Sequence, residues 1–447
     1  MKLSCVWTVG LVLVGTSIGA PGAAALNAPH SIHHAKAAEP HLVEPHRAAG
    51  HRAEARDAAK PATKSARARS EAKPATAHAK GRAKAAPAEQ PAHLTARGQS
   101  RASLRRAALT ARRRGPVERF TASSYARGDI FAGDVTAGED PVVRQAAIDA
   151  MGGMNGTAVV IDPSNGRILA MINQKLALSG GAEPCSTIKI TVAMAALSEG
   201  LVTRDTPVKL AGFRMNMTEA LAHSNNLYFE ELGRELGFER VRHYATQFGL
   251  GELAGYHIQG EQLGVYPDKE LPASAGGVGR MCSFGQSVSL TPLQLGAYVA
   301  AIANGGTLYY LQHPTSQQEA ANFEPKVKRT LDIAKYIPDV QDGMAGSVEY
   351  GTARRLRASF HELPVFGKTG TCSENGTRLG WFASYSDTPQ GSIVTVFFVE
   401  GGRPVSGPTS AGLTGLFYKN LWERNYFAGK NQQVAEVAPA ASTEQAQ

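Results

Sequence analysis

The chain has 447 residues, and its 47 lysines and arginines against 38 acidic residues give a formal net charge of +9. This charge is unevenly placed, because residues 26–115 carry 19 Lys and Arg against 6 Asp and Glu, whereas residues 116–447 carry 27 against 32. The basic character therefore belongs to an N-terminal arm. The rest of the chain is slightly acidic, which argues against a folded domain that binds nucleic acid through its overall charge.

The N-terminus has the pattern of an export signal. Lys2 precedes an apolar run at residues 6–18 and a stretch of small residues at 20–28. This pattern predicts a signal peptide over residues 1–25 and a mature chain in the periplasm or cell envelope. The alternative is an uncleaved anchor through residues 5–20, which is shorter than the roughly 20 residues that a spanning helix needs.

Residues 26–115 are dominated by Ala, His, Lys, Arg and Pro. Such a segment cannot bury enough apolar surface to offset its chain entropy, so we expect it to be disordered. Two roles stay open for it: a solvated tether, or a contact with anionic cell-wall polymer or lipid headgroups. No nucleic-acid partner is expected. Residues 427–447 are likewise poor in large apolar residues and predict a disordered tail, which leaves 116–426 as the folded part.

The folded part begins and ends with predicted strands. A helix over 140–151 leads into a hairpin with strands over 157–162 and 167–173, turning at Pro163 to Gly166. The region 184–350 is predicted to be mainly helical. The expected later elements are helices over 185–199, 227–236, 291–304 and 409–426 and strands over 364–372, 379–387 and 392–400. This order predicts an α/β protein of the α+β kind, with a five-stranded antiparallel sheet, flanking helices and an all-helical lobe.

The first chemical signal is Ser186-Thr187-Ile188-Lys189 at the start of a predicted helix. A spacing of three residues places the hydroxyl and the amine on one helix face. A helix start also favours negative charge, and a lysine whose pKa is lowered by burial can act as a base. Alone, the pattern fits equally a helix-capping serine beside a surface lysine.

Two further clusters follow in the chain. Ser224-Asn225-Asn226 lies between two helical stretches, where its side chains either converge on a site or simply cap the next helix. Lys368-Thr369-Gly370-Thr371 lies on a predicted strand, where the glycine allows a ligand backbone to approach and the lysine and hydroxyls can hold a carboxylate. The alternative for Lys368 is a charge that protects an edge strand from pairing.

The joint occurrence of these three clusters, in this order, resembles the penicillin-binding protein and serine β-lactamase superfamily. The resemblance extends to the hairpin around Asp162 and Pro163, to Phe284-Gly285-Gln286, and to the stretch from Leu290 to Leu295. It covers residues 139–425. It implies a serine D,D-transpeptidase that takes part in peptidoglycan synthesis and that needs no metal or organic cofactor.

The resemblance also implies a role for each residue. Ser186 would attack a D-Ala-D-Ala stem peptide or a β-lactam, Lys189 would take its proton, and Ser224 would relay a proton to the leaving nitrogen. Asn226 would bind the substrate amide. The terminal carboxylate would be held by Lys368, Thr369 and Thr371, and the backbone N–H groups of Ser186 and Thr371 would form the oxyanion hole.

The chain departs from the family pattern in two places. Only about a dozen residues separate the hairpin from Ser186, and Gln286-Ser287 stands where Gln-Gly is usual. After removal of the signal three cysteines remain. Cys185 and Cys372 match the positions that a disulfide joins in certain carbapenem-hydrolysing class A β-lactamases. The resemblance therefore implies the same disulfide here, with Cys282 left as a thiol.

Two other functions remain open. A serine β-lactamase of class A would need a further carboxylate base, and no Glu-x-x-Leu-Asn segment lies between Asn226 and Lys368, although Glu252 and Glu261 have no assigned role. The third reading is a non-catalytic sensor of β-lactams or cell wall, in which acylation is the signal.

Overall fold

The computed structural model describes residues 120–428. The predicted signal, the arm and the tail lie wholly or largely outside these residues, so their boundaries stay predictions. Among the described residues no helix is long and apolar enough to cross a membrane.

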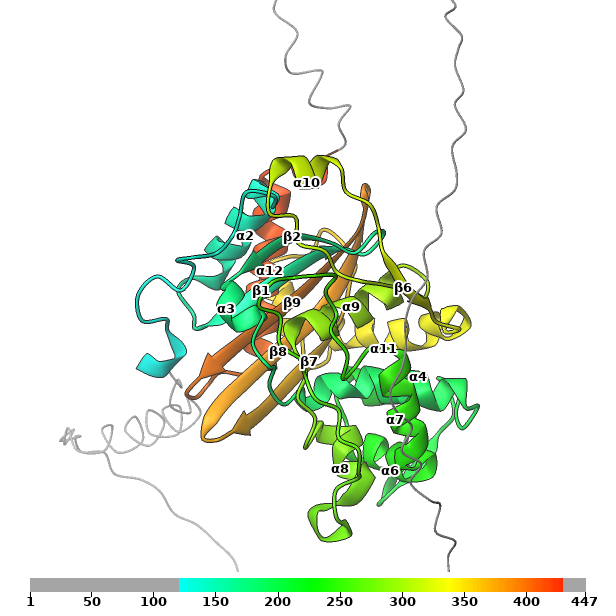
Figure 1. Cartoon of the computed structure of the whole chain (residues 1–447). Coiled ribbons are helices and arrows are strands. Elements are labelled where there is room, and N and C mark those ends of the chain that lie inside the picture. Colours follow the sequence, from blue (N-terminus) through cyan, green and yellow to red (C-terminus); the bar gives the residue numbers. More distant parts are fainter. Residues whose placement is uncertain (1–119, 429–447) are drawn as a thin grey trace, which may run out of the picture. The chain divides into compact units, whose positions relative to one another are not determined.

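One five-stranded antiparallel sheet organises the domain, with strand order β2-β1-β9-β8-β7 (Figure 1). Its strands are β1 (Gly156–Asp162), β2 (Arg167–Ile172), β7 (Val365–Glu374), β8 (Thr377–Thr388) and β9 (Gly391–Gly401). The first and last thirds of the domain meet where Val159 of β1 pairs with Val396 of β9. The predicted strands are all present, each within a few residues of its expected ends.

The central strands are apolar on both faces because helices cover both. Along β1, Ala158 and Val160 pack in one core cluster, and the alternating Val159 and Ile161 pack in the other. The first face is covered by α2 (Pro141–Met151) and α12 (Gly407–Glu423), and the second by α9 (Pro292–Ala303).

The helical lobe surrounds α4 (Lys189–Ser198), in which every residue from 189 to 197 is buried. The remaining α-helices of residues 120–428, in the lobe and elsewhere, are α3 (Gln174–Ala177), α5 (Met217–Ala222), α6 (Asn226–Leu236), α7 (Phe238–Gln247), α8 (Gly277–Phe284), α10 (Gln317–Ala321) and α11 (Ile337–Glu349). One apolar cluster runs from this lobe to the sheet face under α9. The nucleophile region therefore lies at a packed junction.

The region 184–350 is less helical than expected. It contains two small sheets, β3 (Val208–Leu210) with β4 (Phe213–Met215), and β5 (Thr307–Tyr309) with β6 (Val327–Thr330). Residues 251–272 contain no helix or strand. The all-helical expectation fails here because Gly, Pro and short polar runs between the helices carry no clear periodicity.

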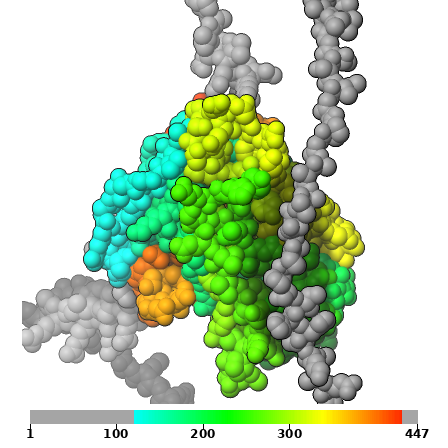
Figure 2. Space-filling model, in the orientation of Figure 1, coloured from blue at the N-terminus to red at the C-terminus, as the bar shows by residue number. Residues whose placement is uncertain are grey.

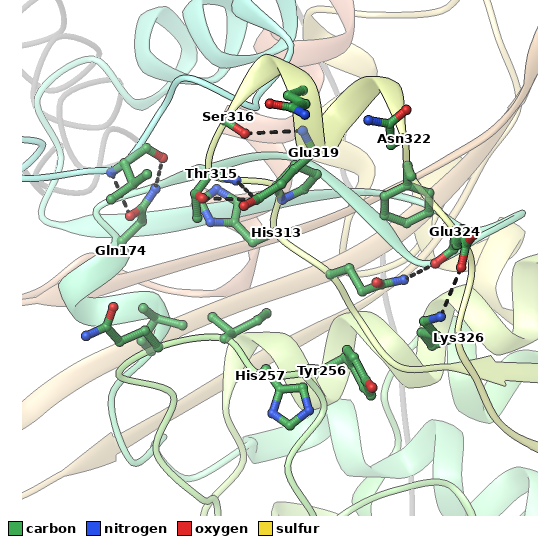
Figure 3. Close-up of a pocket in the computed structure, with 18 of the residues that line it drawn as sticks. Gln174, Tyr256, His257, His313, Thr315, Ser316, Glu319, Asn322, Glu324 and Lys326 are labelled. Atoms are coloured by element: carbon green, nitrogen blue, oxygen red, sulfur yellow. Dashed lines mark hydrogen bonds and ion pairs between the residues drawn. The ribbon is translucent and has the colours of Figure 1, made fainter. Parts of the chain in front are cut away.

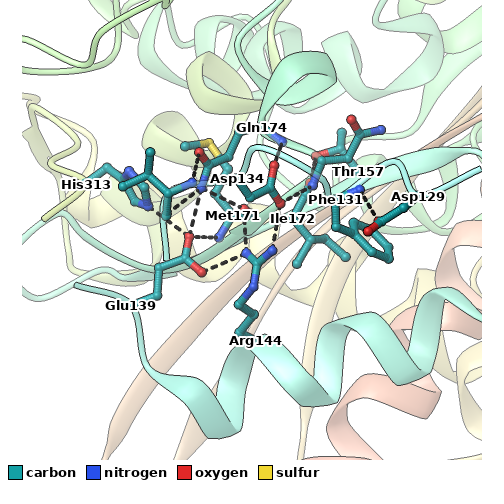
Figure 4. A network of polar contacts seen from close by, with 12 residues as sticks. Asp129, Phe131, Asp134, Glu139, Arg144, Thr157, Met171, Ile172, Gln174 and His313 are labelled. Carbon is teal, nitrogen blue, oxygen red and sulfur yellow. Dashed lines mark hydrogen bonds and ion pairs between the residues drawn. The ribbon is translucent and has the colours of Figure 1, made fainter. Parts of the chain in front are cut away.

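A buried charged network lies where α2 meets β2 (Figure 4). Arg144 donates to Asp134 at 2.7 Å and to Glu139 at 2.9 Å, and Nε2 of His313 lies 2.8 Å from Glu139. Although burial opposes it, the hydrogen bond to Asp134 and the charge of Glu139 raise the pKa of Arg144. Each buried charge in this network therefore has a partner, and the network ties residues 134–139 to the sheet.

Candidate active site

Ser186 lies in a short 3-10 helix, Cys185–Ile188, which runs directly into α4. The predicted α-helix over 185–199 is therefore split, and its first turn is tighter than expected. Ser186 is partly accessible, whereas Lys189, one turn later, is fully buried. Cys185 has a φ of 52°, a left-handed conformation that is uncommon for a residue other than glycine.

Lys189 contacts the nucleophile candidate directly. Its Nζ lies 2.7 Å from Oγ of Ser186 and 2.9 Å from Oδ1 of Asn226, and it also donates to the carbonyl of Ser283. Burial lowers the pKa of Lys189 well below its ordinary value, the positive charge of Lys368 lowers it further, and Glu230 opposes them. A neutral amine beside a hydroxyl can accept the hydroxyl proton.

The bend at Ser224 to Asn226 serves both of the roles considered from the sequence. Asn225 caps α6, because its side chain accepts from the N–H of Tyr228 at 3.0 Å. Ser224 has a φ of 54° and lies 2.8 Å from Nζ of Lys368, while Asn226 contacts Lys189. The strained turn thus directs Ser224 and Asn226, the residues on either side of the capping Asn225, toward Lys368 and Lys189.

Lys368 and the residues after it lie on β7, the sheet edge beside the lobe. Lys368 is fully buried, and burial lowers its pKa to about 7. Oγ1 of Thr369 lies 2.7 Å from Oγ1 of Thr352, and Oγ1 of Thr371 accepts from the N–H of Gly407. The hydroxyl of Thr369 therefore already has a protein partner, which the sequence did not indicate.

Gly370 is needed for a close contact within the chain itself. A Cβ at this position would lie 2.7 Å from the carbonyl oxygen of Pro184 and 3.1 Å from the methyl group of Thr187. The expected reason was room for a ligand backbone. The observed neighbour is the turn that carries Ser186, so the glycine sets the distance between β7 and the nucleophile.

A disulfide joins Cys185 to Cys372 across the same junction, with the two Cα atoms 5.6 Å apart. Cys282 is a buried free thiol on α8, and burial raises its pKa to about 12. The disulfide links the residue before Ser186 to the residue after Thr371. It therefore bridges the two segments that carry the proposed nucleophile and carboxylate-binding groups.

Three contributors were missed from the sequence. Ser283 supplies a carbonyl to Lys189, Glu230 lies four residues after Asn226 on α6 and brings a negative charge near Lys189, and Thr352 binds Thr369. The i to i+4 spacing of Asn226 and Glu230 is a signal that could have identified the second residue. Nothing local distinguishes Ser283 or Thr352.

The departure at Ser287 has a structural meaning. Ser287 has a φ of 70°, in the region that glycine adopts without cost. The serine thus adopts the backbone conformation that the usual glycine favours, with a strain of roughly 1 kcal/mol or more. The neighbouring Gln286 lies within 3.4 Å of Nε of Arg280.

The two unassigned carboxylates are engaged elsewhere. Glu252 lies 2.7 Å from Nζ of Lys328, and it also pairs with Arg329. Glu261 accepts from the backbone N–H groups of Ala254 and Gly255. Residues 120–428 contain no group of three or more His, Cys, Asp or Glu placed to hold a metal ion.

The chain is similar to several curated proteins. It is 30% identical over 261 residues to stage V sporulation protein D of Bacillus subtilis, covering 48% of this chain and 40% of that protein. It is 25% identical over 353 residues to the peptidoglycan D,D-transpeptidase MrdA of Acinetobacter baumannii, covering 65% and 51%. The chain thus spans about half the length of these relatives or less.

Solved structures share the fold. PBP2 of Pseudomonas aeruginosa, solved with the compound WCK 5153, has a TM-score of 0.55 at 22% identity, covering 66% of this chain and 78% of that one. The transpeptidase domain of Burkholderia pseudomallei penicillin-binding protein 3 also has a TM-score of 0.55, at 18% identity, covering 65% and 96%.

A family model described as the penicillin binding protein transpeptidase domain matches residues 156–414. The match runs from β1 into α12 and includes every residue of the cluster around Ser186. The chain belongs to the penicillin-binding protein transpeptidase family.

Proposed function

We propose that this protein is a serine D,D-transpeptidase that acts in the cell envelope on D-Ala-D-Ala stem peptides of peptidoglycan, and that β-lactams acylate it at Ser186. The observation that carries the proposal is the 2.7 Å contact between Nζ of Lys189 and Oγ of Ser186 at a buried lysine whose pKa is strongly lowered. Few structural roles would require a buried amine against a partly exposed hydroxyl.

The first half-reaction follows from this contact. Neutral Lys189 takes the proton of Ser186 as Oγ attacks the carbonyl carbon, and a tetrahedral oxyanion forms. The backbone N–H groups of Ser186 and Thr371 stabilise this charge, a contribution of about 3 kcal/mol per donor. The C–N bond then breaks as the proton taken by Lys189 is relayed through the hydroxyl of Ser224 to the leaving nitrogen, which leaves Lys189 neutral and an acyl-enzyme on Ser186.

Substrate binding is assigned to the opposite wall of the site. The ammonium form of Lys368 and the hydroxyl of Thr371 hold the terminal carboxylate, and Asn226 binds the substrate amide. The hydroxyl of Thr369 assists in binding the carboxylate, and its orientation is set by its hydrogen bond with the hydroxyl of Thr352. In the second half-reaction an amine of another stem peptide attacks the acyl group, which restores the serine and forms the cross-link.

Partners outside the active site stay predictions. The arm at residues 26–115 is expected to contact anionic wall polymer or the membrane surface, either as a mature N-terminus or behind an anchor at residues 5–20.

The experiment that tests the proposal is labelling with a fluorescent penicillin. The wild-type chain should form one covalent adduct on the peptide that contains Ser186, which persists for hours. Ser186→Ala should abolish the label, and Ser164→Ala in the exposed β1–β2 turn should leave it unchanged. Rapid loss of the label with turnover would instead identify a β-lactamase, and labelling of Ser186→Ala would refute the assignment.

A further inference from the structure

A large polar cavity lies outside the cluster around Ser186 (Figure 3). Its volume of about 1050 Å³ slightly exceeds the roughly 300–1,000 Å³ typical of ligand sites. Its lining comes from residues 133–135, from α3 and the residue after it, from residues 256–259, and from residues 312–326. Figure 2 shows the last two segments, coloured green and yellow, against one another on one face.

The charged groups of the cavity are balanced. Lys175 and Lys326 stand against Glu319 and Glu324, and Lys326 pairs with Glu324 at 3.3 Å. Glu319 is occupied by the N–H and hydroxyl of Thr315 at 2.7 and 2.9 Å. This cavity therefore has no excess charge to attract a phosphate, a nucleotide or a polyamine.

Several neutral polar groups remain available. The side chains of Gln259, Gln318 and Asn322 line the cavity and make no hydrogen bond with other residues among 120–428. Each amide can donate and accept at once, which suits a ligand whose hydroxyls also do both. Leu178 and Ile258 add apolar surface next to these amides.

Tyr256 adds an exposed aromatic face at the same place. Its side chain is 43% exposed, and its ring is held edge-on by Tyr310 at 5.8 Å and by His257 at 4.3 Å. His257 has a φ of 55°, so the backbone here is kept in an uncommon conformation. An exposed ring fixed by its neighbours binds with little loss of conformational entropy.

We propose that this cavity binds the N-acetylated glycan strand of the cell wall, with a pyranose ring stacked on Tyr256. The hydroxyl and acetamido groups bind Gln259, Gln318 and Asn322, and an acetyl methyl packs against Leu178 or Ile258. The choice of a cell-wall glycan rests on the proposed function, whereas the preference for a neutral, hydroxyl-rich chain rests on the lining.

The cavity is connected to the nucleophile by a short segment. Leu178 lines the cavity and Ser186 follows eight residues later, so their Cα atoms are at most about 29 Å apart. A second hollow of about 310 Å³ is lined by Ser179, Gly181 and Ala182, midway along this segment, together with Glu374 of β7. A glycan held in the cavity would keep its attached stem peptide close to Ser186.

The test uses tetra-N-acetylchitotetraose, a soluble glycan without stem peptides, titrated into the full exported chain by calorimetry. The wild-type chain should bind it, and Tyr256→Ala should weaken binding about tenfold, the loss expected for an aromatic anchor. Tyr256→Phe, which keeps the ring, should restore most of the affinity. The matched control is Tyr125→Ala, since Tyr125 is 45% exposed and does not line the cavity.

Labelling by fluorescent penicillin separates this inference from the proposed function. Tyr256→Ala should be labelled at the wild-type rate, and Ser186→Ala should bind the glycan normally. A chain that binds the glycan but is not labelled would refute the enzymatic assignment alone. The inference is overturned if the wild-type chain fails to bind at millimolar glycan, if Tyr256→Ala binds equally well, or if cellotetraose, which lacks acetamido groups, binds with the same affinity.

Discussion

Buried charges occur in two regions of this domain, and the two are built differently. Around Arg144 each charge has an opposite charge within hydrogen-bond distance, and the pKa of the arginine is raised. Around Ser186 the hydrogen-bond acceptors of the two buried lysines are hydroxyl, amide and carbonyl oxygens rather than carboxylates, and the pKa of each lysine is lowered. Pairing stabilises the first region, whereas the absence of pairing keeps the second region reactive.

The largest expected effect tests the unpaired region. Lys189→Met removes the proposed base, so acylation by penicillin should fall by about 10²- to 10⁴-fold. The free energy of unfolding should change little, because methionine removes both the desolvation cost of a buried amine and the hydrogen bonds that this amine donates. Stopped-flow labelling and urea titration measure the two quantities.

The matched control is Lys419→Met, which removes a lysine from the exposed pair with Glu423. It should change neither quantity measurably. A Lys189→Met variant that is strongly destabilised and still acylates at the wild-type rate would make Lys189 a structural residue.

The paired region should respond in the opposite way. Arg144→Met leaves Asp134 and Glu139 buried without their common partner, so the free energy of unfolding should fall by about 3–5 kcal/mol. The acylation rate of the folded fraction should not change. Urea denaturation measures the loss, and Arg424→Met, at a half-exposed pair with Asp149, should cost only about 0–1 kcal/mol. Equal losses in the two variants would contradict the comparison.

The smallest effect is a pH dependence. Lys368 is protonated below its pKa of about 7 and loses its charge above it, so its attraction for a substrate carboxylate weakens as the pH rises. The second-order rate constant of acylation by a β-lactam that carries a carboxylate should therefore decline above about pH 7, by at most about tenfold per unit.

Lys189 acts in the other direction, because its neutral form increases with pH. The expected profile is a bell whose upper limb belongs to Lys368. In Lys368→Arg the charge persists, so the upper limb should disappear even if the overall rate is lower. A wild-type profile without this limb, or an unchanged limb in Lys368→Arg, would show that Lys368 does not control it.

Much of the fold follows from local patterns in the sequence. The Asn375-Gly376 pair between two runs rich in β-branched and aromatic residues predicts β7 and β8, and both Asn375 and Gly376 adopt positive φ as a tight hairpin turn requires. The cluster around Ser186 was predictable because each part has its own short motif. The motifs at Ser224 and Lys368 are 144 residues apart in the chain, so only the resemblance to a family predicted that they would meet in space.

The remaining features depend on packing between distant segments. Ser283 contributes a backbone carbonyl, which leaves no trace in the type of side chain. Thr352 matters only through its contact with Thr369, and the network of Arg144 joins residues from 134 to 313. The cavity beside Tyr256 takes its lining from four separate segments, so no single stretch of sequence predicts it.

The link between Cys185 and Cys372 closes a covalent ring around nearly the whole helical lobe, since the two cysteines are 187 residues apart. The chain enters this ring at Cys185 and leaves it at Cys372, and the disulfide holds both points beside Ser186. A protease that nicks the lobe once therefore releases no fragment until a thiol reductant is added. The same link would keep the sheet and the nucleophile turn tethered to one another if the lobe unfolded locally.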